Sequence, residues 1–150
     1  LDLIGRKVLG SGGKLLMGFT KLVHKFCEDH KDNGVQKFVE PLAHYNKEWG
    51  ELTMKIGEAA MQNPDEAGAA AVDYLMYAGY VTLAYFWAQM AAVAKEKLEA
   101  GTDEKEFYQA KIHTAHFYFD RILPRALMHK ESMLSGADNL MDMEEALFAF

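Results

Sequence analysis

This chain of 150 residues has only 1 cysteine and 3 prolines, and it has fewer basic residues (16) than acidic ones (22). Its one cysteine, Cys27, cannot close a disulfide within the chain, so a disulfide-stapled fold is excluded and a reducing, cytoplasmic setting is expected. Cys27 is then interpreted as a free thiol of the core. A net charge of -6 does not provide the basic face that a nucleic-acid surface needs, so we expect no nucleic-acid partner.

Two further absences concern the start and the middle of the chain. Residues 1–6 lack an initiator methionine and the basic-then-apolar pattern of a signal peptide, so a piece of a longer protein is expected. Residues 74–94 lack any charged side chain and are long enough to cross a bilayer. This run is built on alanine, glycine and tyrosine, however, and it includes Thr82 and Gln89. A central helix buried by its neighbours, with no membrane partner, is expected instead.

Apolar residues at alternating spacings of three and four are abundant, and they predict amphipathic helices. The longest such stripe comprises Val35, Phe38, Leu42, Tyr45, Trp49, Leu52, Ile56 and Ala59. Two shorter stripes comprise Leu15, Phe19, Leu22 and Phe26, and Tyr108, Ile112, Ala115, Phe119, Ile122 and Ala126. A two-residue alternation typical of strands is missing, so the predicted fold class is all-α.

Turn and capping signals set the predicted boundaries. Asn63-Pro64-Asp65-Glu66 supplies an N-cap, a first-turn proline and an early acid, while Gly101 supplies a C-cap and Asp32-Asn33-Gly34 a turn. We therefore predict one domain with a flexible lead-in over 1–13, helices over about 14–31, 34–62, 64–100 and 103–134, and an acidic tail over 135–150.

Short turns between these helices favour antiparallel neighbours, which predicts an up-down antiparallel four-helix bundle with the third helix in the middle. Pro124 is expected to bend the last helix near Arg121, because proline removes an amide and crowds the preceding turn. Pro41 is early enough in its helix to sit near the first turn.

Motifs that could carry chemistry are incomplete. Residues 8–14 are similar to a phosphate-binding loop, but Val8 replaces the first glycine and Leu15 replaces the magnesium-binding hydroxyl residue. A di-iron bundle would need paired Glu-x-x-His steps, and the sequence has none. No serine or cysteine has a recognisable catalytic context, so no catalytic, cofactor-binding or metal residue is assigned.

His113, His116 and Asp120 lie at offsets of three and seven, so they would share one face of the last helix and could hold a metal. Three ligands from one helix rarely close a metal shell. With 6 histidines in the chain, chance pairs are also common, so a metal is not expected.

Glu40, His44 and Glu48 also follow one helix face and could pair a base with an orienting acid. Solvated charge on the helix surface is the preferred interpretation. The aromatic residues of the third helix are interpreted mainly as core, with some facing a partner subunit or another domain because they surround the helix: Tyr74, Tyr77, Tyr80, Tyr85, Phe86 and Trp87.

Residues 1–9, Leu-Asp-Leu-Ile-Gly-Arg-Lys-Val-Leu, resemble the segment that follows the flavin-side glutamate motif in acyl-CoA dehydrogenases. The rest resembles the extra C-terminal helical domain of one subgroup of that family, which includes enzymes acting on methylthiopropanoyl-CoA and similar thioesters. The segments concerned are residues 74–88 (Tyr-Leu through Phe-Trp-Ala), residues 107–125 (Phe-Tyr-Gln-Ala-Lys through Arg-Ile-Leu-Pro-Arg) and Gly136-Ala137-Asp138.

The resemblance implies a parent enzyme in which a glutamate removes the α proton of an acyl-CoA thioester while the β hydrogen passes as hydride to FAD. That glutamate would lie just before Leu1, so no catalytic or FAD-contacting residue is carried onto a numbered position. The implied role is packing beside the catalytic domains of a homo-oligomeric flavoprotein, with no cofactor held by this chain. A stand-alone helical interaction or scaffold domain without a cofactor is the alternative.

Overall fold

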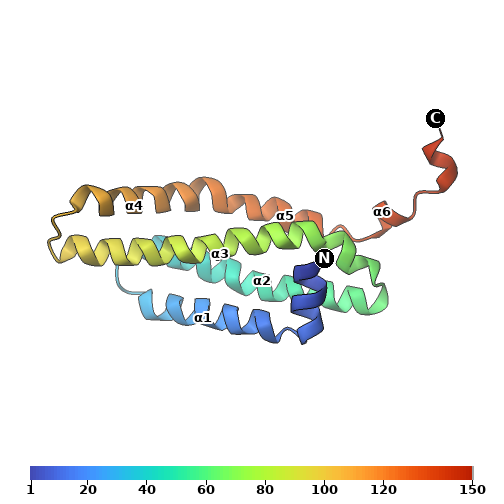
Figure 1. The fold of residues 1–150 in the computed structure, drawn as a ribbon, viewed down its shortest axis with the longest axis horizontal. Helices are drawn as coiled ribbons and strands as arrows, with labels where there is room; N and C mark the ends of the chain where they lie inside the picture. The colour runs from blue at the N-terminus through green and yellow to red at the C-terminus, as the bar shows by residue number, and fades with distance from the viewer. Residues whose placement is uncertain (150) are drawn as a thin grey trace.

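The computed structural model describes residues 1–149, and every regular element in that range is helical (Figure 1). The elements in chain order are η1 (Asp2–Val8), η2 (Leu9–Ser11), α1 (Lys14–His30), α2 (Gln36–Gln62), α3 (Asp65–Glu99), α4 (Lys105–Phe117), η3 (Tyr118–Ile122), η4 (Leu123–Arg125), α5 (Ala126–Met133), α6 (Asp138–Met141) and η5 (Glu145–Phe148). The all-α class predicted from the apolar spacing is confirmed.

α3 is the central helix, as the sequence predicted. It packs against α2, α4 and α5, and η1 also packs on it, whereas α1 packs on α2. Successive long helices run in opposite directions along the molecule (Figure 1). Tyr74, Tyr77 and Val81 of α3 are fully buried in the resulting core. Across residues 1–149 no helix, α3 included, combines the length and the apolarity that a bilayer crossing requires.

The ends of α3 follow from local residue chemistry. The Asn63 side chain accepts a hydrogen bond from the amide of Asp65 (3.1 Å), which satisfies one of the free amides at the helix start. Gly101 follows the last turn with a φ of 82°, a conformation that favours glycine. α3 is accordingly one residue shorter at each end than the range predicted from these signals.

The N-terminal segment differs from the flexible lead-in predicted over 1–13. Asp2–Val8 is a π-helix and Leu9–Ser11 is a 3-10 turn. Ile4 and Val8, four positions apart, are buried in the core cluster and anchor this segment. The turn into α1 is made by Gly12 and Gly13, whose φ angles are 61° and 77°.

The helix predicted over 103–134 is interrupted near Pro124, which cannot supply the amide that a regular α-helix needs there. The chain passes from α4 through the π-helical η3 and the 3-10 segment η4 before α5 begins. Arg121 lies in η3, so the irregularity falls where a bend was predicted. Pro41 lies in the second turn of α2 rather than the first.

The acidic tail predicted over 135–150 holds α6 and η5, and it extends away from the packed helices (Figure 1). Residues 138–149 are exposed. The start of the tail is fixed by Ala137, which is buried and whose amide donates a hydrogen bond to Glu66 Oε1 at the beginning of α3 (3.2 Å). Phe150 lies outside the described residues.

Candidate functional site

A buried ionic cluster joins α2, α3 and α5. Glu48 of α2 is only 8 % exposed, and its two carboxylate oxygens contact different helices. Oε2 accepts a hydrogen bond from the hydroxyl of Tyr77 on α3 (2.8 Å), and Oε1 accepts one from Nζ of Lys130 on α5 (2.6 Å). His44 lies at the rim, with its Nε2 4.0 Å from Oε1. The carboxylate of Glu48 therefore holds three helices together.

The ionisation of this cluster is fixed by its contacts. Burial raises the pKa of Glu48, but hydrogen bonds from Lys130 and Tyr77 outweigh it, so the pKa lies below the ordinary carboxyl value. The hydrogen bond to Glu48 raises the pKa of Lys130, and burial and then Glu48 raise the pKa of Tyr77. Acid–base catalysis near neutral pH needs pKa values moved toward 7, and these three are moved away from it.

A second polar pair lies beside this cluster. Nδ1 of His129, the neighbour of Lys130 on α5, is 2.7 Å from Oδ1 of Asp73 on α3. The His129 ring also stacks on Tyr80, with ring centroids 5.7 Å apart. These contacts fasten α5 to α3.

The interpretation of Glu40, His44 and Glu48 as solvated surface charge is wrong for Glu48, although Glu40 and His44 are exposed. Helical spacing shows which residues share a face, but it does not show that Lys130, 82 positions away, covers one edge of that face. The sequence did contain one sign that Glu48 is buried. Glu48 stands three positions after Tyr45 and four before Leu52, so it lies on the same helix face as the apolar stripe.

The three candidate metal ligands of the last helix do not converge. The His116 ring packs against Phe38, with centroids 4.8 Å apart, and Oδ2 of Asp120 lies 3.9 Å from Nζ of Lys37. His113 is exposed. In the part of the chain that the structure describes, no three histidine, cysteine, aspartate or glutamate side chains are grouped as a metal site would require.

Cys27 is buried in the core cluster, which confirms its interpretation as a core thiol. Burial, and then the neighbouring carboxylate of Glu28, raise the pKa of Cys27 to about 11. Because the thiolate is the nucleophilic form of cysteine, this side chain is unreactive at neutral pH.

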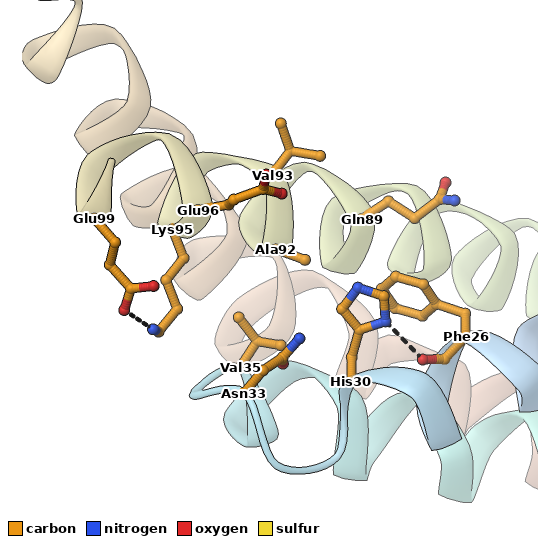
Figure 2. Close-up of a pocket in the computed structure, with 10 residues that line it drawn as sticks. All are labelled: Phe26, His30, Asn33, Val35, Gln89, Ala92, Val93, Lys95, Glu96 and Glu99. Atoms are coloured by element: carbon orange, nitrogen blue, oxygen red, sulfur yellow. Dashed lines mark hydrogen bonds and ion pairs between the residues drawn. The ribbon is translucent and has the colours of Figure 1, made fainter. Parts of the chain in front are cut away.

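A hollow of about 540 Å³ lies between the end of α1, the turn into α2 and the second half of α3, and Figure 2 draws the residues that line it. Phe26 and Ala92 contribute apolar surface to it, and the His30 ring stacks on Phe26 with centroids 4.2 Å apart. Glu96 and Glu99 line it on the α3 side, and Glu99 is paired with Lys95 (Figure 2). The hollow therefore combines apolar surface with polar side chains, among them two carboxylates and one lysine that is already paired.

Neither this hollow nor the glycine-rich turn fits a flavin dinucleotide. FAD carries a diphosphate, which needs unpaired cationic groups, but the one lysine of the hollow is paired with Glu99 and Glu96 adds a second negative charge. In the turn, the amides of Gly12 and Gly13 donate to the carbonyls of Leu9 and Val8 (2.9 Å each), so they are not free to hold a phosphate.

The aromatic residues of α3 divide between core and surface. Tyr74, Tyr77 and Tyr85 are buried, as the core interpretation predicted. Tyr80 and Trp87 are partly buried, and Phe86 is 48 % exposed. α3 thus presents apolar surface outside the core that its own chain forms.

Comparison with known proteins identifies the family to which this helical chain is similar. A family model described as acetyl-CoA dehydrogenase C-terminal like matches residues 19–144. The chain is 28% identical to a 3-methylmercaptopropionyl-CoA dehydrogenase of Ruegeria pomeroyi over 142 residues, which cover 93% of this chain and 24% of that protein. It is 31% identical to the broad-specificity linear acyl-CoA dehydrogenase FadE5 of Mycobacterium tuberculosis over 156 residues, which cover 98% of this chain and 26% of that protein.

The chain spans about a quarter of the length of the curated relatives it matches. The family match covers all of α2, α3, α4 and α5 and most of α1, and it ends within the tail. The chain belongs to the acetyl-CoA dehydrogenase C-terminal-like family, the C-terminal helical domain of acyl-CoA dehydrogenases.

Proposed function

We propose that this chain is one structural domain of an FAD-dependent acyl-CoA dehydrogenase, packed beside the catalytic part and taking no part in the chemistry. The observation that carries the proposal is the match of residues 19–144 to the C-terminal family. Both relatives are named as acyl-CoA dehydrogenases, which supports an acyl-CoA thioester as substrate of the parent enzyme.

The side chains of this chain support a structural role. Glu48, Tyr77 and Lys130 satisfy one another between helices, with pKa values displaced from neutrality, and Cys27 is buried. We therefore assign no catalytic, cofactor-binding or metal residue here. In the parent, FAD would accept the hydride from the β carbon while a base outside this chain removes the α proton, giving an enoyl-CoA.

The architecture that we propose is an up-down antiparallel four-helix bundle with a short acidic tail. α1, α2, α3 and the α4–α5 segment would be its four members. The alternating directions of these helices and the central place of α3 support this arrangement (Figure 1).

The parent is further proposed to be a cytoplasmic homo-oligomer with neither nucleic-acid nor membrane partners. Its single free cysteine in this domain and the net charge of -6 support a reducing compartment and an acidic, soluble surface. The other domains of the parent would be the direct partners of this chain.

Flavin content tests the proposal. The full-length protein encoded by the gene is expected to purify with bound FAD, whereas this chain alone, folded by circular dichroism, is expected to bind none in a fluorescence titration. Tight FAD binding by the isolated chain would show that it holds the cofactor. A full-length protein without flavin would instead favour the stand-alone interaction domain.

A further inference from the structure

α3 presents an apolar seam on the side turned away from α2. Tyr74 and Tyr77 face α2, where their hydroxyls contact Thr53 and Glu48. At 100° per residue, Leu83 lies half a turn around the helix from Tyr74, and it is 51 % exposed. We name this surface the outer seam; it comprises Val72, Leu75, Met76, Gly79, Leu83, Phe86, Met90 and Val93, all exposed except the partly buried Met90.

The spacing of residues along the outer seam indicates that a helix would cover it. Positions 72, 76, 79, 83, 86, 90 and 93 alternate steps of four and three, which is the 3.5-residue repeat of a helix–helix seam. At 1.5 Å per residue the seam is roughly 30 Å long. A partner helix of about 20 residues would cover it.

The charge of the surroundings indicates a permanent contact. Residues 74–94 contain no charged side chain, so α3 itself contributes no charge to the seam or its edges between Leu75 and Val93. Interfaces that form and separate carry a polar, solvated rim, whereas permanent ones resemble a domain core cut in half.

Gly79 lies in the middle of the outer seam, where the lack of a side chain would let a covering helix approach closely. It is exposed in the middle of α3, and a Cβ added there would meet nothing within 4 Å. Glycine destabilises a helix interior relative to alanine, so the packing within this chain gives no reason for it. Close approach of another backbone to the seam at Gly79 does give one.

α1 lies on the Tyr85 side of α3 and has exposed leucines of its own. Phe19 and Phe26 of α1 contact Tyr85 of α3 edge-on, with centroids 5.8 Å and 5.5 Å away, so this side of α1 is turned toward α3. Leu15 and Leu22 flank the two rings on α1, and both are more than half exposed.

We infer that a helix from the catalytic part of the same polypeptide lies along the outer seam, an inference that rests on the proposed function. The chain spans about a quarter of its relatives, so most of the parent polypeptide is left to supply this helix. η1 packs on α3, which brings the segment leading into the domain beside the helix that carries the seam (Figure 1). Attachment within one polypeptide also suits the permanent contact that the uncharged stretch of α3 indicates.

Thiol labelling of the full-length protein tests this inference. Leu83→Cys and, as a control of similar exposure on α5, Leu127→Cys are made in a Cys27→Ala background; the parent leucines are 51% and 46% exposed. Maleimide labelling of each position is followed by mass spectrometry and normalised to its rate in denaturant. The position 83 thiol is expected to react at least about tenfold more slowly than the position 127 thiol, because burial excludes the reagent. Equal rates would overturn the inference, and so would a disulfide-linked dimer through position 83, which would make a second copy the occupant.

A pair of glycine substitutions tests the close approach. In the full-length Leu83→Cys protein, Gly79→Leu is expected to accelerate labelling several-fold, because the added side chain separates the two helices. Gly50→Leu on α2, where a Cβ also meets nothing within 4 Å, is the matched control and should leave the rate unchanged. Equal effects of the two changes would contradict a backbone contact at Gly79.

Dye reduction with an acyl-CoA is measured on the same Leu83→Cys and Leu127→Cys proteins. An active flavoprotein whose position 83 thiol reacts freely overturns the seam inference alone. A flavin-free, inactive protein whose position 83 thiol is protected overturns the proposed function alone.

Discussion

Nζ of Lys130 lies 2.6 Å from Oε1 of Glu48, an ion pair between α5 and α2 that spans 82 positions of sequence. The side chain of Glu48 is 10% accessible and that of Lys130 is 30% accessible, so the pair is largely withdrawn from water. Tyr77 completes the cluster from α3. Glu48, Lys130 and Tyr77 thereby hold α2, α5 and α3 together.

Replacing Lys130 is expected to destabilise the chain. Lys130→Met leaves the Glu48 carboxylate with one hydrogen-bond donor fewer in a buried place, which lowers the free energy of unfolding by about 1–3 kcal/mol. Urea denaturation of the isolated chain measures it. The control is Lys47→Met, which removes an exposed ion pair to Glu51 and should change stability by less than about 0.5 kcal/mol. Equal effects would show that the buried pair contributes no more than a surface one.

Acid should weaken the same cluster. The pKa of Glu48 is lower in the folded chain than the ordinary carboxyl value, so its contribution is fully present above about pH 4.3 and is lost as the pH falls through the folded pKa. The stability difference between wild type and Glu48→Gln is therefore expected to shrink below about pH 4.3 in urea titrations. The exposed Glu58→Gln serves as control. A difference that stays constant or grows on acidification would contradict this assignment.

Trp49 is predicted to be one of the main contributors to the core. It is 5% exposed and its ring meets Phe19 edge-on, with centroids 5.9 Å apart. Trp49→Ala removes buried surface and leaves a cavity, so a loss of roughly 3–5 kcal/mol is expected in chemical denaturation. Met61→Ala, at a residue that is 83% exposed, should stay within about 0.5 kcal/mol of wild type. A loss below about 1 kcal/mol at Trp49 would place it outside the core that determines stability.

Gly79→Ala should stabilise the isolated chain. The new methyl group meets nothing, and alanine loses less backbone entropy than glycine in a helix, so the free energy of unfolding should rise by roughly 0.5–1 kcal/mol. Gly101→Ala should have the opposite sign, because its φ of 82° disfavours a side chain. Thermal unfolding of both variants checks the prediction, and a destabilised Gly79→Ala chain would mean that Gly79 serves packing within this chain.

The sequence predicted the long helices because apolar stripes run along them and capping residues mark their ends. The apolar stripe from Val35 to Ala59 runs through most of α2, and Asn63 and Gly101 delimit α3. The membership of the family was also predictable, because the segments that resemble acyl-CoA dehydrogenases fall largely within the matched residues 19–144.

The buried cluster and the N-terminal segment could not be predicted in the same way. Glu48 looks like surface charge until α5 is placed against it, and no local pattern states that Lys130 arrives there. η1 is short, and the two apolar residues that anchor it, Ile4 and Val8, are too few to give a recognisable helical stripe. Both features depend on contacts between segments distant in the sequence.

We propose that this chain is a structural domain whose parent carries out acyl-CoA oxidation elsewhere in the polypeptide. Acyl-CoA-dependent reduction of a dye, measured side by side on the full-length protein and on the isolated chain, tests it most directly. We expect turnover by the full-length protein and none by the folded isolated chain, with or without added FAD. Dye reduction by the isolated chain, or its absence in a flavin-loaded full-length protein offered a range of acyl-CoA thioesters, would show that this domain is not the structural part of such an enzyme.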